Sequence, residues 1–294
     1  MRKVKIAIVG IFVLTSIVFG VYTVKSFITV DRTPPVINSE TDVITVSVQD
    51  EEKVLFQGLT AEDDKDGDLT DSIRVFSMSH FISESKRTIS YIVFNEENLA
   101  TTYERTMEYT DYVSPKIYMT EPLRYNKTEV EKADFTKALT ASDCLDGDLT
   151  AEIRAFSDTY FYNITPGSYP VIFQVSNSAG DTCTVSVDVI ITDSLNTTEH
   201  KKYYPMLSNY IVYTSVNKPV DLRQYLIGVK QNNIEHLFEV DPEIAGVKEN
   251  ITISGSIDYA TPGVYPMDCS YTSIEGITAV TKAYIVVESE KNAE

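Results

Sequence analysis

The chain opens with one long apolar run. Residues 6–24 are 19 consecutive uncharged positions, and as an α-helix at about 1.5 Å per residue they reach about 28 Å. This length is close to the hydrocarbon thickness of a bilayer. Three bases, Arg2, Lys3 and Lys5, come before the run, whereas only Lys25 and Arg32 follow it closely. The pattern predicts a cytoplasmic stub and transmembrane signal anchor over residues 1–30.

The distribution of bases also predicts the orientation of this helix. Because positive residues are retained on the cytoplasmic side, we expect the N-terminus inside and all later residues outside the cell membrane, in a single-pass topology. The alternative is a cleaved secretory signal, which needs a small residue at each of two positions before the cleavage site. The nearest candidate is Val18-Phe19-Gly20. Cleavage after this tripeptide would release a secreted chain.

Beyond residue 30 the apolar positions follow a period of two. The alternation is clear over 169–175, 183–191 and 265–271, where every second residue is apolar. Short alternating runs separated by turn residues are typical of antiparallel sheets with one buried face. No stretch after residue 30 holds a long helical period. The sequence therefore predicts an all-β fold of β-sandwiches.

Two sequence repeats divide this part of the chain. Residues 59–77 recur as 139–157, with 13 of 19 positions identical, and Thr165-Pro-Gly-Ser-Tyr-Pro170 is echoed by Thr261-Pro-Gly-Val-Tyr-Pro266. Self-similarity at such a spacing indicates tandem structural units. We predict domains over 31–113, 114–193 and 204–288, with a linker over 194–203 and a tail over 289–294.

The order of these motifs carries a resemblance to a known family. Pro34-Pro-Val-Ile37, the Leu-Thr-Ala-x-Asp-x-x-Asp-Gly-Asp-Leu-Thr-x-x-Ile motif and Pro-Gly-x-Tyr resemble the bacterial immunoglobulin-like domains first described in an insecticidal crystal protein. Two copies fit residues 35–193, and the third unit keeps only the Pro-Gly-x-Tyr part. The resemblance implies tandem immunoglobulin-like sandwiches, an extracellular setting on a bacterium and no enzymatic activity of their own.

The charge balance restricts the partners of the exported part. Formal net charge is -18, and since residues 1–30 hold four bases and no acid, the remainder carries 21 bases against 43 acids, or -22. So acidic a surface repels phosphate backbones, which excludes nucleic acid as a partner. The remaining partners are the membrane, through the N-terminal helix, and an unknown extracellular protein or glycan.

The repeated acidic motif has two interpretations. Its carboxylates are hard oxygen ligands of the kind that calcium uses, and they belong to Asp63, Asp64, Asp66, Asp68, Asp143, Asp146 and Asp148. However, the glycine and the downstream glutamate that a calcium-binding loop requires are missing from their places. We therefore favour a structural turn at each Asp-Gly, with Asp68 and Asp148 capping a short helical turn. Calcium is the only cofactor under consideration.

Aromatic residues supply another candidate for binding. Tyr160 and Tyr162 would form an exposed platform on which a sugar ring stacks, while Phe161 recurs as Phe81 and is expected to pack in the core. Tyr169 and Tyr265 resemble the tyrosine corner of immunoglobulin-like sandwiches, a folding device.

Catalytic chemistry has little support in the sequence. Three histidines, at 80, 200 and 236, are scattered over the three units, without a nucleophile in a recognised arrangement. Cys183 and Cys269 are in phase with inward apolar positions and are expected to be core thiols, whereas Cys144 lies in the acidic loop. A Cys144–Cys183 disulfide is left open. We expect that the protein is not an enzyme.

The third unit differs most from the others. The acidic motif recurs after 80 residues, from 59 to 139, whereas the Pro-Gly-x-Tyr motif recurs after 96 residues, from 165 to 261. The third unit is therefore 16 residues longer. The extra segment, 235–247, contains His236 and Phe238, which we take as candidate binding residues. The alternative is that it packs as an additional strand or short helix.

These features lead to one principal hypothesis about function. It is a membrane-anchored stalk of immunoglobulin-like domains on a bacterial surface, which acts in adhesion or interaction by non-covalent binding. If the units run end to end, the third stands farthest from the membrane. An alternative is an extracytoplasmic accessory subunit of an envelope polymer or secretion complex, and a weaker one is a glycan-active enzyme.

Overall fold

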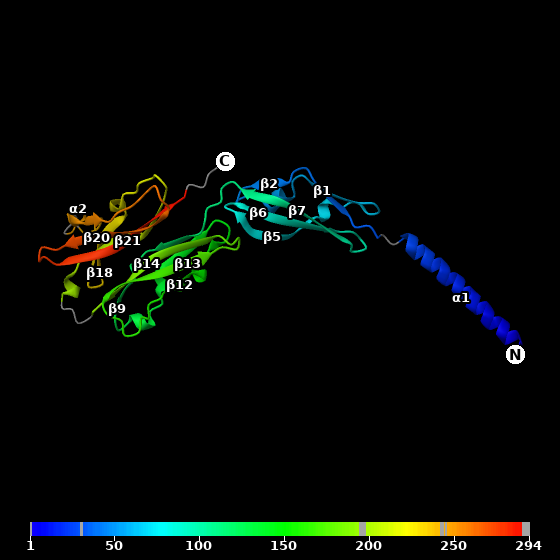
Figure 1. The fold of residues 1–294 in the computed structure, drawn as a ribbon, viewed down its shortest axis with the longest axis horizontal. Coiled ribbons are helices and arrows are strands. Elements are labelled where there is room, and N and C mark those ends of the chain that lie inside the picture. The colour runs from blue at the N-terminus through cyan, green and yellow to red at the C-terminus, as the bar shows by residue number, and fades with distance from the viewer. Residues whose placement is uncertain (1, 30–31, 194–197, 242–243, 245, 290–294) are drawn as a thin grey trace. The chain divides into compact units, whose positions relative to one another are not determined.

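The computed structural model describes residues 2–29, 32–193, 198–241, 244 and 246–289. It contains an N-terminal helix followed by three β-sandwiches (Figure 1). The predicted all-β fold class, with immunoglobulin-like sandwiches behind an N-terminal apolar helix, is confirmed. The chain forms two compact units, Met1–Asp111 with the first sandwich and Tyr112–Glu294 with the second and third.

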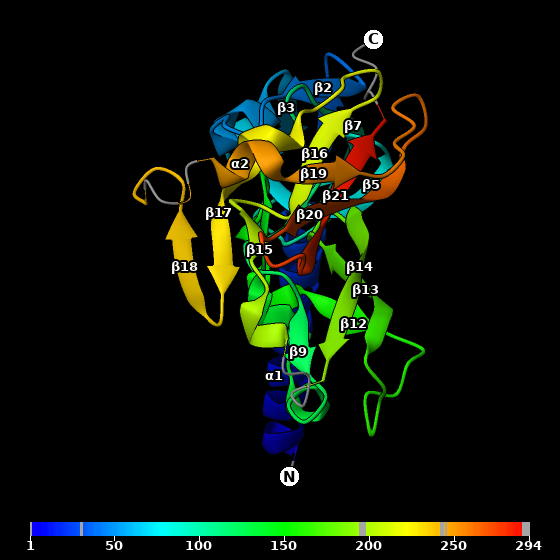
Figure 2. The same ribbon diagram turned by 90° about the vertical axis from the view of Figure 1, so that its left-hand side faces the viewer.

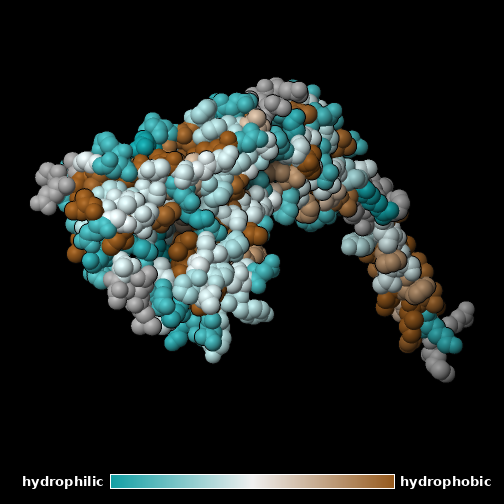
Figure 3. Space-filling model, turned by 60° about the vertical axis from the view of Figure 1, so that its left-hand side comes forward, coloured by the Kyte–Doolittle hydropathy of each residue, from teal (hydrophilic) through white to brown (hydrophobic). Residues whose placement is uncertain are grey.

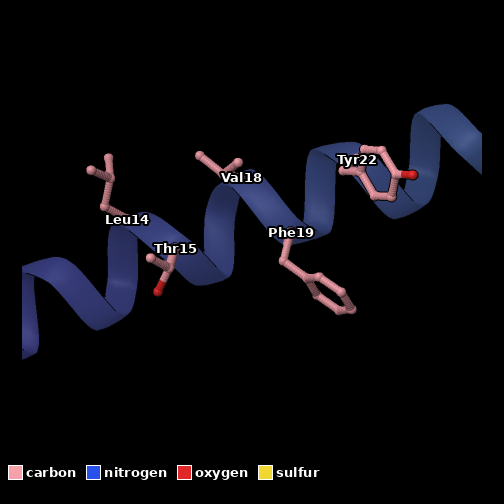
Figure 4. A pocket seen from close by; sticks show the side chains of 5 residues that line it. All are labelled: Leu14, Thr15, Val18, Phe19 and Tyr22. Atoms are coloured by element: carbon pink, nitrogen blue, oxygen red, sulfur yellow. The ribbon is translucent and has the colours of Figure 1, made fainter.

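Helix α1 (Arg2–Thr29) is apolar on all sides. Its segment Val4–Lys25 has a mean hydropathy of 2.4, is long enough to cross a membrane, and has no residue buried within the structure. Apolar residues, drawn in brown, make up much of the visible side of the helix in Figure 3. One shallow depression along the helix is lined by side chains from successive helical turns (Figure 4), which are Leu14, Thr15, Val18, Phe19 and Tyr22. Since a single helix supplies all of them, this depression is a feature of the helix surface.

The first sandwich contains two sheets, with strand orders β1-β3-β4 and β2-β7-β6-β5. Its strands are β1 (Val36–Ser39), β2 (Val43–Val46), β3 (Leu59–Asp63), β4 (Gly67–Asp68), β5 (Arg74–Ser83), β6 (Lys86–Phe94) and β7 (Ala100–Tyr109). Its short 3₁₀ helices are η1 (Glu52–Phe56) and η2 (Thr70–Ser72).

The second sandwich repeats this arrangement, with strand orders β8-β10-β11 and β9-β14-β13-β12. Its strands are β8 (Lys116–Met119), β9 (Arg124–Asn126), β10 (Leu139–Asp143), β11 (Gly147–Asp148), β12 (Arg154–Phe156), β13 (Gly167–Ser176) and β14 (Thr182–Thr192). Its 3₁₀ helices are η3 (Val130–Lys132), η4 (Phe135–Ala138) and η5 (Thr150–Glu152).

The third sandwich has the strand orders β15-β17-β18 and β16-β21-β20-β19. Its strands are β15 (Tyr204–Leu207), β16 (Ile211–Ser215), β17 (Leu226–Gln231), β18 (Ile234–Leu237), β19 (Thr252–Ser254), β20 (Gly263–Thr272) and β21 (Thr278–Glu288). Its helical turns are η6 (Glu199–Lys201), which precedes β15, η7 (Leu222–Tyr225) and α2 (Val247–Asn250). Part of the predicted linker, 194–197, and part of the predicted tail, 290–294, lie outside the described residues.

All three sandwiches share one topological device. The chain leaves the first sheet after its opening strand, and the next strand joins the second sheet parallel to the last strand of the domain: β2 to β7, β9 to β14 and β16 to β21. This switch of sheets lets the opening segment pair with both layers. The alternating apolar residues then face each other between the layers and form the core.

The second and third sandwiches share one hydrophobic cluster. Buried residues of both domains belong to it, among them Ile117, Val187, Ile211 and Tyr284. The first sandwich has a separate cluster around Ile89, whose described members all lie in unit 1. The second and third sandwiches are therefore packed against each other as one body.

Candidate functional site

The first acidic motif folds into a turn held by its own carboxylates. Asp63 is buried at the end of β3, and its Oδ1 accepts hydrogen bonds from the backbone N–H groups of Lys65 and Asp66, both at 3.0 Å. Its Oδ2 accepts from Asn95 Nδ2 at 3.2 Å, and Asp66 accepts from the Glu96 N–H at 2.7 Å. These bonds tie the turn to the hairpin between β6 and β7.

The second motif repeats these contacts in the second sandwich. Asp143 Oδ2 accepts from the N–H groups of Leu145 (2.8 Å) and Asp146 (3.1 Å), and Oδ1 accepts from Asn177 Nδ2 at 3.2 Å. Asp146 accepts from both the N–H and the hydroxyl of Ser178. Because one geometry serves both copies, the repeat maintains a structural connection between the turn and the β13–β14 hairpin.

The final aspartate of each motif bonds to the first residue of the 3₁₀ turn that follows, whereas the N-cap position that we predicted for it belongs to Leu69 and Leu149. Asp68 Oδ1 accepts from the Thr70 N–H and Asp148 Oδ1 from the Thr150 N–H, each at 2.9 Å. These side-chain and backbone hydrogen bonds with Thr70 and Thr150 lower the pKa of the two exposed carboxyls. The glycines before them, Gly67 and Gly147, have φ angles of +77° and +75°, where a side chain would be strained.

The carboxylates thus face backbone N–H groups instead of a common centre. Within the described residues, no group of three or more His, Cys, Asp or Glu side chains is placed to hold a metal ion. Asp64 is exposed beside the turn. The contacts match the turn interpretation, and the response to calcium stays a prediction.

The aromatic candidates lie in the connection between β12 and β13. Tyr160 is 90% exposed and Tyr162 is 72% exposed. Between them, Phe161 packs against the rings of Phe135, at 4.8 Å between centroids, and Tyr169, at 6.2 Å. Phe161 therefore anchors the loop and leaves its two tyrosine neighbours in solvent.

Both predicted tyrosine corners are present. The hydroxyl of Tyr169 donates to the carbonyl of Thr165 at 2.9 Å, and that of Tyr265 donates to the carbonyl of Thr261 at 2.8 Å. Each hydroxyl closes the loop that enters a long strand, β13 or β20. This bond to the backbone upstream is the mark of a tyrosine corner.

The extra segment of the third sandwich begins as an edge strand. Asn232 and Asn233, at φ +47° and +66°, make a two-residue turn that pairs β18 with β17. Two positive φ values are the signature of a type I′ hairpin. This arrangement is the alternative interpretation, an additional strand, with helix α2 just after it; residues 242, 243 and 245 lie outside the described residues.

The two candidate binding residues of this segment are half-buried and make local contacts. His236 Nδ1 lies 3.0 Å from Asp241 Oδ2. The Phe238 ring packs against the hydrophobic cluster of unit 2, and its backbone N–H donates to the carbonyl of Ile227 at 3.0 Å. Among the described residues, no hydrogen bond, ion pair or ring contact joins the histidine or the phenylalanine to Tyr160 or Tyr162.

The hairpin also exposes three apolar residues, of which Leu237 and Val240 belong to the extra segment and Ile234 comes just before it. Ile234 is 60% exposed, Leu237 37% and Val240 76%. Figure 2 shows β18 at the outer edge of its sheet, with β17 on one side only. The Asn-Asn pair between two apolar runs was a signal for this hairpin, since asparagine tolerates positive φ in tight turns.

The thiols occupy sites of different kinds. Cys269 is buried in the third sandwich, where burial raises the pKa of its thiol to about 11. Cys183 carries a free thiol that is half-buried and lies 3.6 Å from the hydroxyl of Tyr213, a residue of the third sandwich. Cys183 is thus part of the contact between two domains, and it does not form the disulfide with Cys144 that was left open.

Comparison with known proteins adds no family assignment. No family model and no curated protein matches the chain. Solved structures with some likeness include the M60 catalytic domain with CBM51-1 and CBM51-2 from Clostridium perfringens ZmpB, at 11% identity, 89% coverage of this chain and a TM-score of 0.22. The chain spans 31% of that structure's length.

Two further structures show likeness of the same low degree. CBM51-2 in complex with GlcNAc and INT domains of C. perfringens ZmpB is 12% identical, over 55% of this chain and 44% of that one, at a TM-score of 0.22. The cis-dimer of protocadherin gammaB7 EC3-6 is 11% identical, over 87% and 74%, at 0.19. At such scores these structures supply no argument about ligands or activity.

Proposed function

We propose that this protein is a single-pass surface protein of a bacterium, with its N-terminus in the cytoplasm and its β-sandwiches outside. It acts as an interaction stalk that binds an extracellular protein or glycan by non-covalent contacts. Helix α1 supports the anchor, because a 22-residue apolar segment with no residue buried within the protein is suited to a lipid environment. The proposal includes no chemical step, and the protein is not an enzyme under it.

One observation carries the proposal of a binding head in the third sandwich. The first two sandwiches end the corresponding edge with a two-residue strand and an Asp-Gly turn. The third has a four-residue strand, β18, with Ile234, Leu237 and Val240 exposed around it. An open strand edge bordered by apolar side chains is suited to receive an extended segment of a protein partner.

The test compares surface variants of the exported part for binding to cells and envelope material. Ile234→Ser with Leu237→Ser should reduce binding at least about tenfold, since apolar anchors contribute most of the affinity of such contacts. Ile274→Ser is the matched control, because Ile274 is fully exposed in another turn of the same sandwich. Equal binding by the double variant and the control would contradict the proposed head.

A second pair of variants separates a glycan partner from a protein partner. Tyr160→Ser with Tyr162→Ser removes the exposed tyrosines of the second sandwich and should leave protein binding unchanged. Loss of binding in this variant, together with retention of a sugar by the parent on a glycan array, would assign recognition to the tyrosine loop. Sugar turnover in the same screen would contradict the non-enzymatic proposal.

The anchor has its own test. Mass spectrometry of the mature protein should find residues 1–30 attached and the chain in the membrane fraction. A mature chain that begins near Val21 and is recovered from the medium would show the secreted alternative.

A further inference from the structure

The opening strand of each sandwich lies at the edge of its sheet. The backbone N–H and C=O of the second residue in that strand point away from the sheet. In the first sandwich Ile37 is opposite Ala61, whose own N–H donates to Thr70 Oγ1 and whose C=O accepts from the Leu69 N–H. Both backbone groups of Ala61 therefore point away from β1. By the alternation of antiparallel pairing, the N–H and C=O of Ile37 and Ser39 face the open edge.

The second sandwich has the same edge, and the third sandwich covers it. Ile117 occupies the place of Ile37, and its N–H donates to the Tyr213 hydroxyl, which in turn donates to its C=O, both at 2.9 Å. The N–H of Met119 donates to Asn209 Oδ1 at 3.3 Å, and its C=O accepts from the Tyr210 N–H at 2.8 Å. All four outward groups of β8 have partners.

In the third sandwich, a proline in the opening strand β15 blocks the corresponding edge. Pro205 occupies the corresponding buried place in β15, opposite Val229, and proline has no N–H to offer. Proline on an edge strand is a known protection against pairing with another strand. The edge is thus covered in the second domain and blocked in the third, whereas in the first no described residue bonds to the outward groups of Ile37 or Ser39.

We propose that the β1 edge of the first sandwich pairs with the β1 edge of a second copy of this chain. Two β1 strands fit antiparallel around a two-fold axis at Asn38, with Ile37 opposite Ser39 of the other copy on both sides. Four backbone hydrogen bonds then form, because each residue supplies one donor and one acceptor to its counterpart. This pairing rests on the proposed membrane anchor.

The anchor is the reason that the occupant is a second copy. Four-residue strands bury much less than the roughly 1,200 Å² of a stable interface, so the pairing needs a high local concentration. Only six residues, 30–35, separate α1 from β1, and six residues reach at most about 20 Å. Copies anchored in one membrane therefore present this edge at a common height.

Disulfide trapping tests the pairing in the full chain reconstituted into vesicles. Asn38→Cys places two cysteines directly opposite each other, at about 4.5 Å between Cα atoms, within the range for a disulfide. Val36→Cys is the matched control, since two Val36 residues would lie about 13 Å apart in this register. Asn38→Cys should form dimers at least about tenfold faster than Val36→Cys and than the parent with its three native cysteines.

Two further variants connect this dimer to the edge. Ile37→Pro, added to Asn38→Cys, removes the outward N–H and should abolish cross-linking, while Pro205 shows that the fold accepts proline there. If Ile37→Pro does not fold, Asn38→Asp serves instead, with Asn38→Ala as its control. Asn38 is exposed, and two like charges opposite each other should weaken the dimer. The amount of dimer is measured by fluorescence.

The outcomes separate this proposal from the proposed function. Vesicle flotation is read on the same samples, so a chain that does not float contradicts the anchor. A chain that floats but cross-links equally slowly at Asn38 and Val36 overturns the edge pairing and leaves the anchor standing. Cross-linking of Asn38→Cys to a different protein, without a homodimer, also overturns it.

Discussion

The first and second sandwiches share a topology, but one pair of core positions is polar in the first sandwich and apolar in the second. Counting from the matching turns at Asn95 and Asn177, Tyr91 and Arg105 of the first domain correspond to Phe173 and Val187 of the second. All four side chains are buried, and Arg105 is only 3% exposed. One sandwich therefore has a charged residue in its core where the other has a valine.

The arginine is accommodated because the backbone of a neighbouring loop surrounds it with acceptors. Its guanidinium donates to the Tyr91 hydroxyl at 3.1 Å, to the carbonyl of Gln57 at 2.9 Å and to the carbonyl of Leu55. Leu55 and Gln57 lie at the end of η1, in the connection between β2 and β3. Arg105 thus connects this loop to the core through buried hydrogen bonds.

The second sandwich obtains its additional contacts from a different source. Its apolar core continues into that of the third sandwich, and Tyr213 closes its exposed edge. At the same contact, Arg124 donates to the carbonyl of Val280 and lies 3.4 Å from the centroid of the Tyr204 ring. The comparison shows that this topology is completed either by a buried polar group within one domain or by an adjoining domain.

The largest effect is expected from removing the buried guanidinium. Arg105→Ala leaves the Gln57 carbonyl and the Tyr91 hydroxyl without the donor that Arg105 supplies. The Leu55 carbonyl keeps only the bond from the Tyr91 hydroxyl. Because a cavity opens as well, the free energy of unfolding should fall by about 3 kcal/mol or more. Val187→Ala, at the corresponding position, should cost about 2 kcal/mol. Hydrogen exchange of the β6–β7 and β13–β14 hairpins in urea measures each domain separately. A smaller decrease in the free energy of unfolding for Arg105→Ala than for Val187→Ala would contradict the proposed role of Arg105.

The next effect concerns the covered edge of the second sandwich. Tyr213→Phe removes the hydroxyl and leaves the N–H and C=O of Ile117 unpaired in a buried setting, which should cost about 1–3 kcal/mol. The control is Tyr118→Phe, because the ring of Tyr118 contacts Tyr213 while no described hydrogen bond involves its hydroxyl. Faster labelling of the Cys183 thiol is the readout. Equal labelling in the two variants would show that the hydroxyl does not hold the domains together.

A smaller effect should appear in acid. Hydrogen bonds with Thr70 and Thr150 lower the pKa of Asp68 and Asp148 in the folded state below their ordinary value of 3.8. Their contribution to stability is therefore present above that ordinary value and is lost as the pH falls through the lower folded-state pKa. Asp68→Asn with Asp148→Asn should destabilise the protein at pH 7, and the difference from the parent should shrink towards pH 2. A difference independent of pH would contradict the charge-assisted hydrogen bonds with Thr70 and Thr150.

The smallest effect is expected from calcium. Since the carboxylates of both turns accept backbone hydrogen bonds, millimolar calcium should leave the melting temperature unchanged. A site at a hundredfold over its dissociation constant would add about 2.7 kcal/mol, a shift of several degrees. Such a shift, lost in Asp66→Asn with Asp68→Asn, would replace the turn interpretation with a calcium site.

Local features were predictable because neighbouring residues decide them. The apolar run became α1, the period-two segments became strands, and the Pro-Gly-x-Tyr motifs became tyrosine corners. The Asp-Gly turns belong to the same class, since Asp63 and Asp143 bond to N–H groups two and three residues away. For all of these, the interacting groups lie within a few residues of each other in the chain.

By itself, then, the sequence determined the apolar helix, the strands and the turns, because their spacing and backbone preferences are local properties. Only the tertiary structure decided that Tyr213 covers Ile117, that Arg105 finds its acceptors at Leu55 and Gln57, and that β1 keeps an open edge. These contacts join residues 48 to 96 positions apart. No period or motif encodes such pairs, because each depends on which backbone groups the packed sheets leave without a partner.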